Sequence, residues 1–140
     1  MIILDTNVIS EPLRASADKN VTDWINAQDI GTLYLSTIAI AEVRYGIAIM
    51  QDGKRKELLH SNLEQRVLPL FENRILAFDL AASQSYAILR SNARSAGQAI
   101  AQADGYIAAI ALAHGFSIAT RDTKPFTAAG LTVINPWDGI

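Results

Sequence analysis

The sequence predicts an α/β protein in which short parallel strands alternate with helices. The first observation is an apolar run, Ile2–Leu4, that is followed at once by the polar residues Asp5, Thr6 and Asn7. An apolar run bounded by polar turn formers is typical of a short buried strand. The second observation is that four more short β-rich runs follow, and helical segments separate most of them. Strands connected through helices pair in parallel with right-handed crossovers.

The composition is that of a folded globular protein. The chain has 140 residues, half of them hydrophobic, so we expect a single domain over residues 1–140. The absence of cysteine excludes disulfides and thiolate metal sites. No apolar run approaches the length of a membrane span and the N-terminus lacks a signal-peptide pattern, which favours a cytoplasmic protein. Because the net charge is −2, any nucleic-acid binding needs a local basic surface.

The first half of the chain is predicted to form two strands and several helical segments. Thr37 is expected to cap the helix after the second strand, because threonine favours the N-cap position. Pro69 is expected to end the last helix of this half, because proline does not continue a helix. In order, we expect a strand at Ile2–Leu4, helical turns at 8–14, a helix at 21–28, a strand at Leu33–Ser36, and helices at 38–50 and 54–67.

The second half is predicted to form three strands and two long helices. Asp79 is the expected N-cap of the first helix, and Gly97 and Gly115 are expected to end the two helices. The second helix is apolar on most faces, which is typical of a helix that is packed on both sides. In order, we expect a strand at 75–78, helices at 79–96 and 101–114, and strands at Ser117–Ala119 and 131–134.

Four acidic residues stand where a strand gives way to a helix, or inside an apolar helix. Asp5 follows the first strand and Asp122 follows the fourth. Glu42 lies one turn into the helix after the second strand, and Asp104 lies near the start of the apolar helix. Because ligands of open α/β sheets bind beyond the carboxyl ends of the strands, we expect these side chains to meet there. The other acids lie on charged or polar stretches and are expected at the solvated surface.

Each of these acids also has a structural interpretation. Asp5 can cap the helix that follows it, and Asp104 can be stabilised by the N-terminal end of its helix dipole. Glu42 can belong to an exposed helix face together with Arg44. Asp104 is the most informative, because its Ala- and Ile-rich neighbours indicate burial, and an unpaired buried carboxylate costs several kcal/mol.

Clustered carboxylates indicate a hard cation, because like charges repel unless a cation lies among them. Mg²⁺ takes a few carboxylates and several waters, and such a site activates water and stabilises charge on a phosphoryl oxygen. This is the chemistry of metal-dependent phosphodiester hydrolysis. The sequence has no Gly-rich phosphate loop, so an enzyme that uses nucleoside triphosphates is not expected.

Five segments, taken together, resemble a known family. They are LDTNVISE at 4–11, STIAIAEVRYGI at 36–47, ADGYIAAIALAHG at 103–115, ATRD at 119–122 and VINPW at 133–137. In their order and spacing the chain resembles the PIN-domain ribonucleases, specifically the VapC-type toxins of bacterial toxin–antitoxin pairs. The closing INPW is similar to the FitB-like subgroup of these toxins. The first segment alone is a weak signal, whereas all five in order are a strong one.

The resemblance implies a three-layer α/β/α sandwich with a parallel sheet of about five strands. It also implies an endoribonuclease site that depends on Mg²⁺ or Mn²⁺. Asp5 and Asp104 are implied to bind the metal, with Glu42 and Asp122 binding it directly or through water. The implied partners are an RNA substrate and a cognate antitoxin with a DNA-binding N-terminus. A homodimer that forms a hetero-oligomer with the antitoxin, without a membrane, is implied as well.

Residues beside the acids also match the family. Asn7 is implied to orient Asp5, and Thr120 falls on a small hydroxyl position beside the site. The chain departs from the family pattern at Pro125, where many relatives carry a further aspartate, and has Gly105 where alanine is commoner. Some of the scattered arginines are expected to line a groove and hold RNA phosphates, as arginine does well. They are Arg14, Arg44, Arg90, Arg94 and, as our first choice, Arg121.

Three other classes of protein remain as alternatives. A receiver-type signalling domain needs a phosphoacceptor after the third strand and a lysine after the fifth, where this chain has Asp79 and Asn135. A haloacid-dehalogenase-type phosphatase needs Asp-x-Asp after the first strand, and Asn7 occupies the second place. A catalytically inactive PIN-like binding module is the third alternative, and the intact set of acids argues against it.

Overall fold

A computed structural model of the chain describes residues 1–139. At its centre is one parallel sheet of five strands in the order β3-β2-β1-β4-β5. The prediction of an α/β protein with a parallel five-stranded sheet is therefore confirmed. The strands are β1 (Ile2–Leu4), β2 (Leu33–Ser36), β3 (Ile75–Leu76), β4 (Ser117–Ala119) and β5 (Val133–Ile134).

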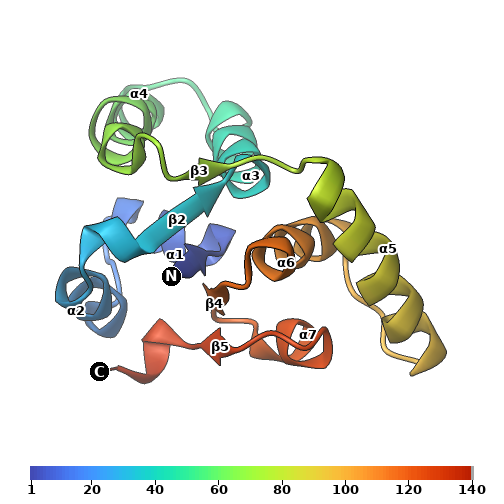
Figure 1. Cartoon of the computed structure of the whole chain (residues 1–140). Coiled ribbons are helices and arrows are strands. Elements are labelled where there is room, and N and C mark those ends of the chain that lie inside the picture. Colours follow the sequence, from blue (N-terminus) through green and yellow to red (C-terminus); the bar gives the residue numbers. More distant parts are fainter. Residues whose placement is uncertain (140) are drawn as a thin grey trace.

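Helices flank the sheet on both sides and form the outer layers of the sandwich. The α-helices are α1 (Thr6–Ser10), α2 (Lys19–Ala27), α3 (Thr37–Ala48), α4 (Lys54–Ser61), α5 (Leu80–Ser95), α6 (Gln102–His114) and α7 (Thr123–Ala128). Shorter turns are η1 (Glu11–Leu13), η2 (Ile30–Thr32), η3 (Asn62–Val67), η4 (Leu68–Phe71) and η5 (Pro136–Asp138). In Figure 1 the strands stand in the middle, with α2 on one side and α5, α6 and α7 on the other. Within residues 1–139, no helix is both long enough and apolar enough to cross a lipid bilayer.

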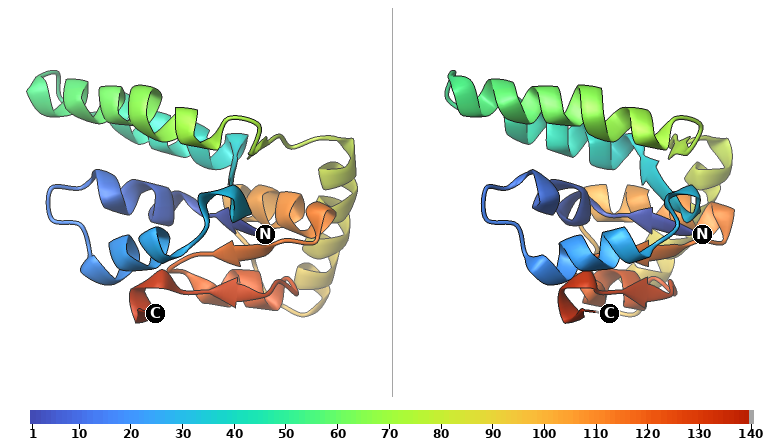
Figure 2. Two further views of the ribbon diagram at one scale, coloured as in Figure 1. Left: turned by 60° about the vertical axis from the view of Figure 1, so that its left-hand side comes forward. Right: turned by 90° about the vertical axis from the view of Figure 1, so that its left-hand side faces the viewer.

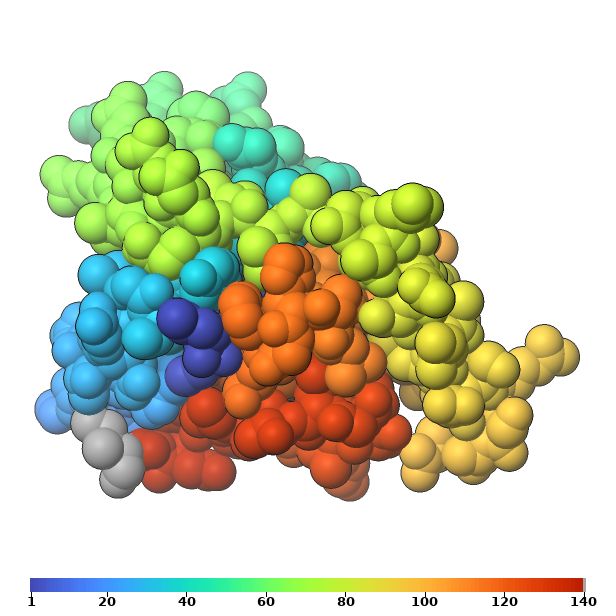
Figure 3. All heavy atoms as spheres, in the orientation of Figure 1, coloured from blue at the N-terminus to red at the C-terminus, as the bar shows by residue number. Residues whose placement is uncertain are grey.

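β1 is the central strand, and its position determines where Asp5 lies. Ile3 of β1 pairs with Tyr34 of β2 on one side and with Ile118 of β4 on the other, and it is fully buried. In Figure 3 only a small dark-blue patch from the first residues reaches the surface on this face, between light-blue and cyan segments from the first third of the chain and orange segments from its last third. The strand order reverses at β1, and a crevice outside the carboxyl ends is expected at such a point.

α6 is buried on most faces, as its apolar sequence predicts, and it packs against α5, α3 and β4. Gly105 of α6 faces α5, and a Cβ atom at this position would lie 3.2 Å from Cε2 of Tyr86. The Tyr86 ring stacks on the Tyr106 ring with a centroid distance of 4.7 Å. The missing side chain at residue 105 therefore lets α5 and its aromatic ring lie close against α6.

Several elements differ from the sequence-based expectations, and among them the strand predicted for 131–134 contains only Val133–Ile134. The helix predicted for 54–67 is α-helical only in α4, and it continues as a π-helical turn in η3 and a 3₁₀ turn in η4. Pro69 stands in the first turn of η4, where its missing N–H is not needed, so it does not end the helical path. The strand predicted for 75–78 contains only Ile75–Leu76. Helix α7 was not predicted, because six residues are too few to show a helical period.

The N-cap of α3 is Ser36 and not Thr37, which corrects the prediction. Ser36 has extended backbone angles, and its Oγ accepts a hydrogen bond from the Ala39 N–H at 3.0 Å. Thr37 is already the first helical residue, and its side chain is exposed. Because Ser36 is fully buried, water cannot replace its hydroxyl as the acceptor.

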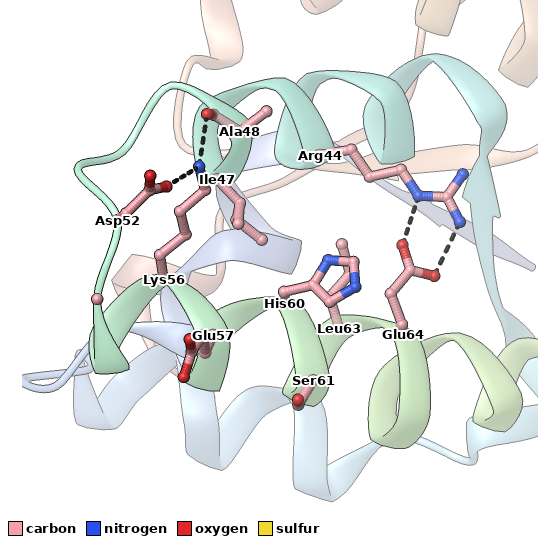
Figure 4. A pocket seen from close by; sticks show the side chains of 11 residues that line it. Arg44, Ile47, Ala48, Asp52, Lys56, Glu57, His60, Ser61, Leu63 and Glu64 are labelled. Carbon is pink, nitrogen blue, oxygen red and sulfur yellow. Dashed lines mark hydrogen bonds and ion pairs between the residues drawn. The ribbon is translucent and has the colours of Figure 1, made fainter.

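α3 and the continuous helical run α4–η3 lie alongside each other and project from the sheet, as both views of Figure 2 show. Arg44 binds both carboxylate oxygens of Glu64, from Nε at 2.7 Å and from Nη2 at 2.9 Å. Lys56 Nζ donates to the Ala48 carbonyl and to Asp52, each at 3.1 Å. These contacts brace the two helices around a hollow of about 800 Å³, which is drawn in Figure 4.

Replacing Ser36 by alanine is expected to lower the free energy of unfolding by about 1 kcal/mol, because the Ala39 N–H loses its acceptor. A loss of this size lowers the melting temperature by roughly 3 °C. Thr37→Ala is the matched control, and because its side chain is exposed its melting temperature should stay within about 1 °C of wild type. If Thr37→Ala is the less stable of the two variants, Ser36 is not the cap.

Candidate active site

The carboxyl ends of β1 and β4 border a hollow of about 430 Å³. The four acids singled out from the sequence, Asp5, Glu42, Asp104 and Asp122, all line it. They come from the end of β1, from α3, from the first turn of α6 and from the connection between β4 and α7. The other lining residues are Thr6, Asn7, Ser10, Glu11, Arg14, Arg121 and Trp137.

Asp5 is held from both sides and is only 4% exposed. Its backbone N–H donates to the Ala119 carbonyl at 2.9 Å, which ties the end of β1 to β4. Its Oδ1 accepts from the Thr6 N–H at 2.8 Å, and its Oδ2 accepts from the Thr120 hydroxyl at 2.7 Å. Asp5 therefore caps α1, as its structural interpretation predicts, and at the same time forms part of the wall of the hollow.

Thr120 lies fully buried behind Asp5 and connects it with the next acid. Its hydroxyl donates to Asp5 and accepts from the Asp122 N–H at 3.1 Å. The expectation that Asn7 orients Asp5 is not met, because within residues 1–139 the Asn7 Oδ1 accepts from the Arg121 N–H at 3.3 Å instead. Asn7 therefore holds the connection between β4 and α7, on which Asp122 lies.

Glu42 and Asp104 reach the hollow from helices. Glu42 is exposed, and its Oε1 accepts from the Thr6 hydroxyl at 2.6 Å. Glu42 and Arg44 are both exposed on α3, as the structural interpretation of Glu42 predicts, and Arg44 binds Glu64. Asp104 is half-buried in the first turn of α6, whose N-cap residue provides no side-chain hydrogen bond. A carboxylate near uncapped N–H groups is in a favourable place for its charge.

The negative charges of neighbouring carboxylates make it less favourable for each of these groups to ionise, which raises the pKa. Burial is the main cause that raises the pKa of Asp104 to about 6, and the charges of Asp5, Asp122 and Glu42 raise it further. Burial also raises the pKa of Asp5, as do Glu42 and Asp122, although hydrogen bonds from Thr120 and Thr6 oppose the rise. A cation among these groups would relieve the repulsion.

The donor atoms of the four acids are all carboxylate oxygens, which fit a hard ion such as Mg²⁺ better than a soft one. Within residues 1–139, no three Asp, Glu, His or Cys side chains converge as a ready-made metal site would require. The hollow therefore offers suitable donor atoms, and its side chains would have to turn inward to share one ion.

Two residues of the hollow go beyond what the sequence predicts. Glu11 belongs with the acids predicted to be solvated, but it is only 4% exposed and pairs with Arg14. Its spacing carried a signal, because Glu11 follows the buried Val8 by three positions and so lies on the same helical face. Trp137 packs against the core, and the Arg121 guanidinium lies over its ring at 5.2 Å from the centroid.

Two of the arginines proposed from the sequence to hold RNA are bound elsewhere. Arg44 binds Glu64, and Arg90 donates to the Tyr86 hydroxyl at 2.6 Å. The basic run at 54–56 forms a mostly solvated helix start. Of the arginines proposed from the sequence, Arg14 and Arg121 line the acidic hollow.

The PIN domain family matches residues 2–130, and the chain therefore belongs to this family. It is 57% identical over 138 residues to the VapC ribonuclease Y4jK of Sinorhizobium fredii, with 99% of each chain covered. It is 51% identical over 137 residues to Toxin FitB of Neisseria gonorrhoeae, covering 98% of this chain and 99% of that one. A solved structure of FitAB bound to an IR36 DNA fragment matches with a TM-score of 0.94 and 50% identity, over 98% of this chain and 96% of that one. The resemblance recognised in the five segments is thus confirmed.

The raised pKa of Asp104 should make stability depend on pH. In metal-free solution the folded state binds more protons than the unfolded chain between the ordinary pKa of 3.8 and about 6. The free energy of unfolding should therefore fall as pH rises through this interval. Asp104→Asn removes this loss, so we expect the variant to be about 1 kcal/mol more stable at pH 7 in EDTA, a value reduced for the solvated part of the side chain.

Thermal melting of both proteins at pH 4.5 and pH 7, with EDTA and with Mg²⁺, measures the effect. Mg²⁺ should stabilise the wild type more than Asp104→Asn, because the ion binds only the folded, deprotonated site. A variant that is less stable in EDTA and keeps the full Mg²⁺ shift would show that Asp104 is a structural helix residue only.

Proposed function

We propose that the chain is a metal-dependent endoribonuclease toxin of a toxin–antitoxin pair, which hydrolyses RNA phosphodiester bonds. The observation that carries the proposal is that four carboxylates line one hollow at the carboxyl edge of the sheet, where burial and the charges of the other three raise the pKa of Asp104 to about 6. Its similarity to proteins named VapC ribonuclease and Toxin FitB supports the same function. Because its substrate is RNA, we place the protein in the cytoplasm.

In this proposal Asp5 and Asp104 bind Mg²⁺ or Mn²⁺, and Glu42 and Asp122 bind it directly or through water. The ion supplies an activated water and stabilises charge on the phosphoryl oxygen. Thr120 keeps Asp5 oriented, because its hydroxyl donates to Oδ2, and this hydrogen bond opposes the rise that burial causes in the pKa of that carboxyl. The remaining acids offer oxygen atoms at the opening, where water and substrate enter.

Arg121 is proposed to hold an RNA phosphate beside the acids. Its backbone is fixed by Asn7, and its guanidinium lies over the Trp137 ring, so the cation is restrained at the wall of the hollow. A restrained cation loses less conformational entropy when it binds a phosphate. The receiver alternative finds no support at Asp79, because the Asp79 side chain caps α5 by accepting from the Ala82 N–H at 2.9 Å.

The purified protein without antitoxin is expected to cleave RNA with Mg²⁺ or Mn²⁺ and not with EDTA. Asp5→Asn and Asp104→Asn should each lower the rate by at least about a hundredfold, because each removes a metal ligand. Asp52→Asn is the control, since this side chain is almost fully exposed on the far hairpin. Cleavage by both active-site variants at the wild-type rate would disprove the assigned site. A protein that binds RNA but never cleaves it would be an inactive binding module.

The proposed antitoxin is expected to place a basic side chain in the acidic hollow, because a cation relieves the same repulsion that the metal relieves. We also propose that the protein forms a homodimer and that this homodimer binds the antitoxin to form a hetero-oligomer. In this assembly the DNA-binding N-terminus of the antitoxin contacts the promoter. The complex should therefore bind Mn²⁺ at least about tenfold more weakly than the antitoxin-free protein does, as measured by calorimetry. Equal affinities would rule out this mode of inhibition.

A further inference from the structure

An ion pair between a buried acid and an exposed arginine, at the wall of the acidic hollow, has no role in the chemistry described above. Glu11 and Arg14 lie three residues apart at the turn η1, directly after α1. Arg14 Nη1 donates to both carboxylate oxygens of Glu11, at 2.9 Å and 3.0 Å. The Glu11 side chain is 6% exposed and the Arg14 side chain is 58% exposed, so the acid is inside and the guanidinium is at the surface.

The geometry of this pair leaves donors available. A guanidinium has five N–H donors in a rigid plane, and here a single nitrogen serves both oxygens of Glu11. Within residues 1–139, Nε and Nη2 of Arg14 have no hydrogen-bond partner. Glu11 thus fixes one corner of the guanidinium and leaves its other donors to bind an anion.

The position of Arg14 is as informative as its geometry. Arg14 lines the acidic hollow and also a neighbouring hollow of about 210 Å³ between α1 and α3. The two hollows share Thr6, Ser10, Arg14 and Glu42, so they adjoin at these residues. Arg14 therefore lies on the path that a strand of RNA would follow from the acidic hollow across the surface into the neighbouring hollow.

A strand of RNA meets a difficulty at this place. The phosphates of the RNA are negative, and so are the four carboxylates that would hold the metal. Any carboxylate charge that the metal does not neutralise repels the phosphates. A cation held beside the acids offsets that repulsion, and arginine binds a phosphate through two parallel hydrogen bonds. Holding the guanidinium in advance lowers the entropy lost on binding.

We propose that Arg14 binds a phosphate of the RNA next to the one that is cleaved, and that Glu11 is the positioning residue that holds Arg14 in place. The proposal rests on the proposed ribonuclease function. Arg14 and Arg121, from opposite ends of the chain, then bind phosphates on the same strand at the wall of one hollow. Neither arginine acts on the reacting atoms, so both affect substrate binding more than the chemical step.

The test is steady-state cleavage of a short fluorescent single-stranded RNA with Mg²⁺ at several salt concentrations. Arg14→Ala should raise KM about tenfold and change kcat by less than about threefold, because a binding contact is lost. The slope of log KM against log salt should fall by about one, as expected for one lost phosphate contact. Arg14→Lys should recover part of the affinity, since the charge remains and the planar fork does not.

The matched control is Arg66→Ala, which removes the same charge from an exposed position in η3 that does not line the acidic hollow. It should leave both KM and the salt slope unchanged within about twofold. A general effect of net charge would instead change both variants alike.

Glu11→Gln separates binding from folding. Arg14→Ala alone leaves a buried carboxylate unpaired and should lower the melting temperature. The double variant Glu11→Gln/Arg14→Ala should recover the melting temperature and keep the high KM, whereas Glu11→Gln alone should raise KM about threefold. A merely structural pair would instead recover KM together with the melting temperature.

If Arg14→Ala matches Arg66→Ala in KM and salt slope, Arg14 binds no substrate phosphate and the proposal is wrong. The ribonuclease function would still stand in that case, because it is tested by metal-dependent cleavage and its loss in Asp104→Asn. If the wild type neither cleaves nor binds the RNA, the proposed function fails and this assignment fails with it.

Discussion

The hydrogen bond from the buried Thr120 hydroxyl to Asp5 joins the two central strands at the edge where the acids lie. A hydrogen bond to an ionised carboxylate is stronger than one between neutral groups, and here no water can replace either partner. The same two side chains accept the N–H groups of Thr6 and Asp122, so they also fix the start of α1 and the entry to α7. The arrangement of the whole site therefore depends on this one contact between residues far apart in the sequence.

Repulsion between the acids of the site lowers the free energy of unfolding, and other interactions of the fold must offset this loss. Four carboxylates around one hollow repel one another, and this repulsion adds to the rise in the pKa of Asp104 that burial mainly causes. Contacts within the site oppose this electrostatic cost. Asp5 accepts hydrogen bonds, Glu42 accepts one from the Thr6 hydroxyl, and Asp104 lies beside the uncapped N-terminus of its helix. Groups whose ionisation is disturbed in this way mark functional sites more often than structural ones.

Those features that depend on neighbouring residues in the chain could be predicted from the sequence. β1, β2 and β4 were predicted to the residue, because each is a short β-rich run with a polar residue at or directly after its end. The burial of Glu11 was indicated only by its spacing from Val8, which places it on the same helical face. The hydrogen bond from Arg121 to Asn7 could not be predicted, because it depends on which segments meet in space. The four acids were identified from their places after strands and in helices. Their mutual effect on pKa required the fold, since the charges are brought together by the sheet.

Gly105 follows Asp104 in the chain and faces α5, a helix that lines no part of the acidic hollow. A side chain at residue 105 would press on the Tyr86 ring, which is stacked on Tyr106 and contacted by Arg90. An alanine at residue 105 would therefore require the Tyr86 ring, or α5 itself, to lie slightly farther out. A substitution on α5 can in this way shift the backbone that carries Asp104, although α5 lines no part of the hollow.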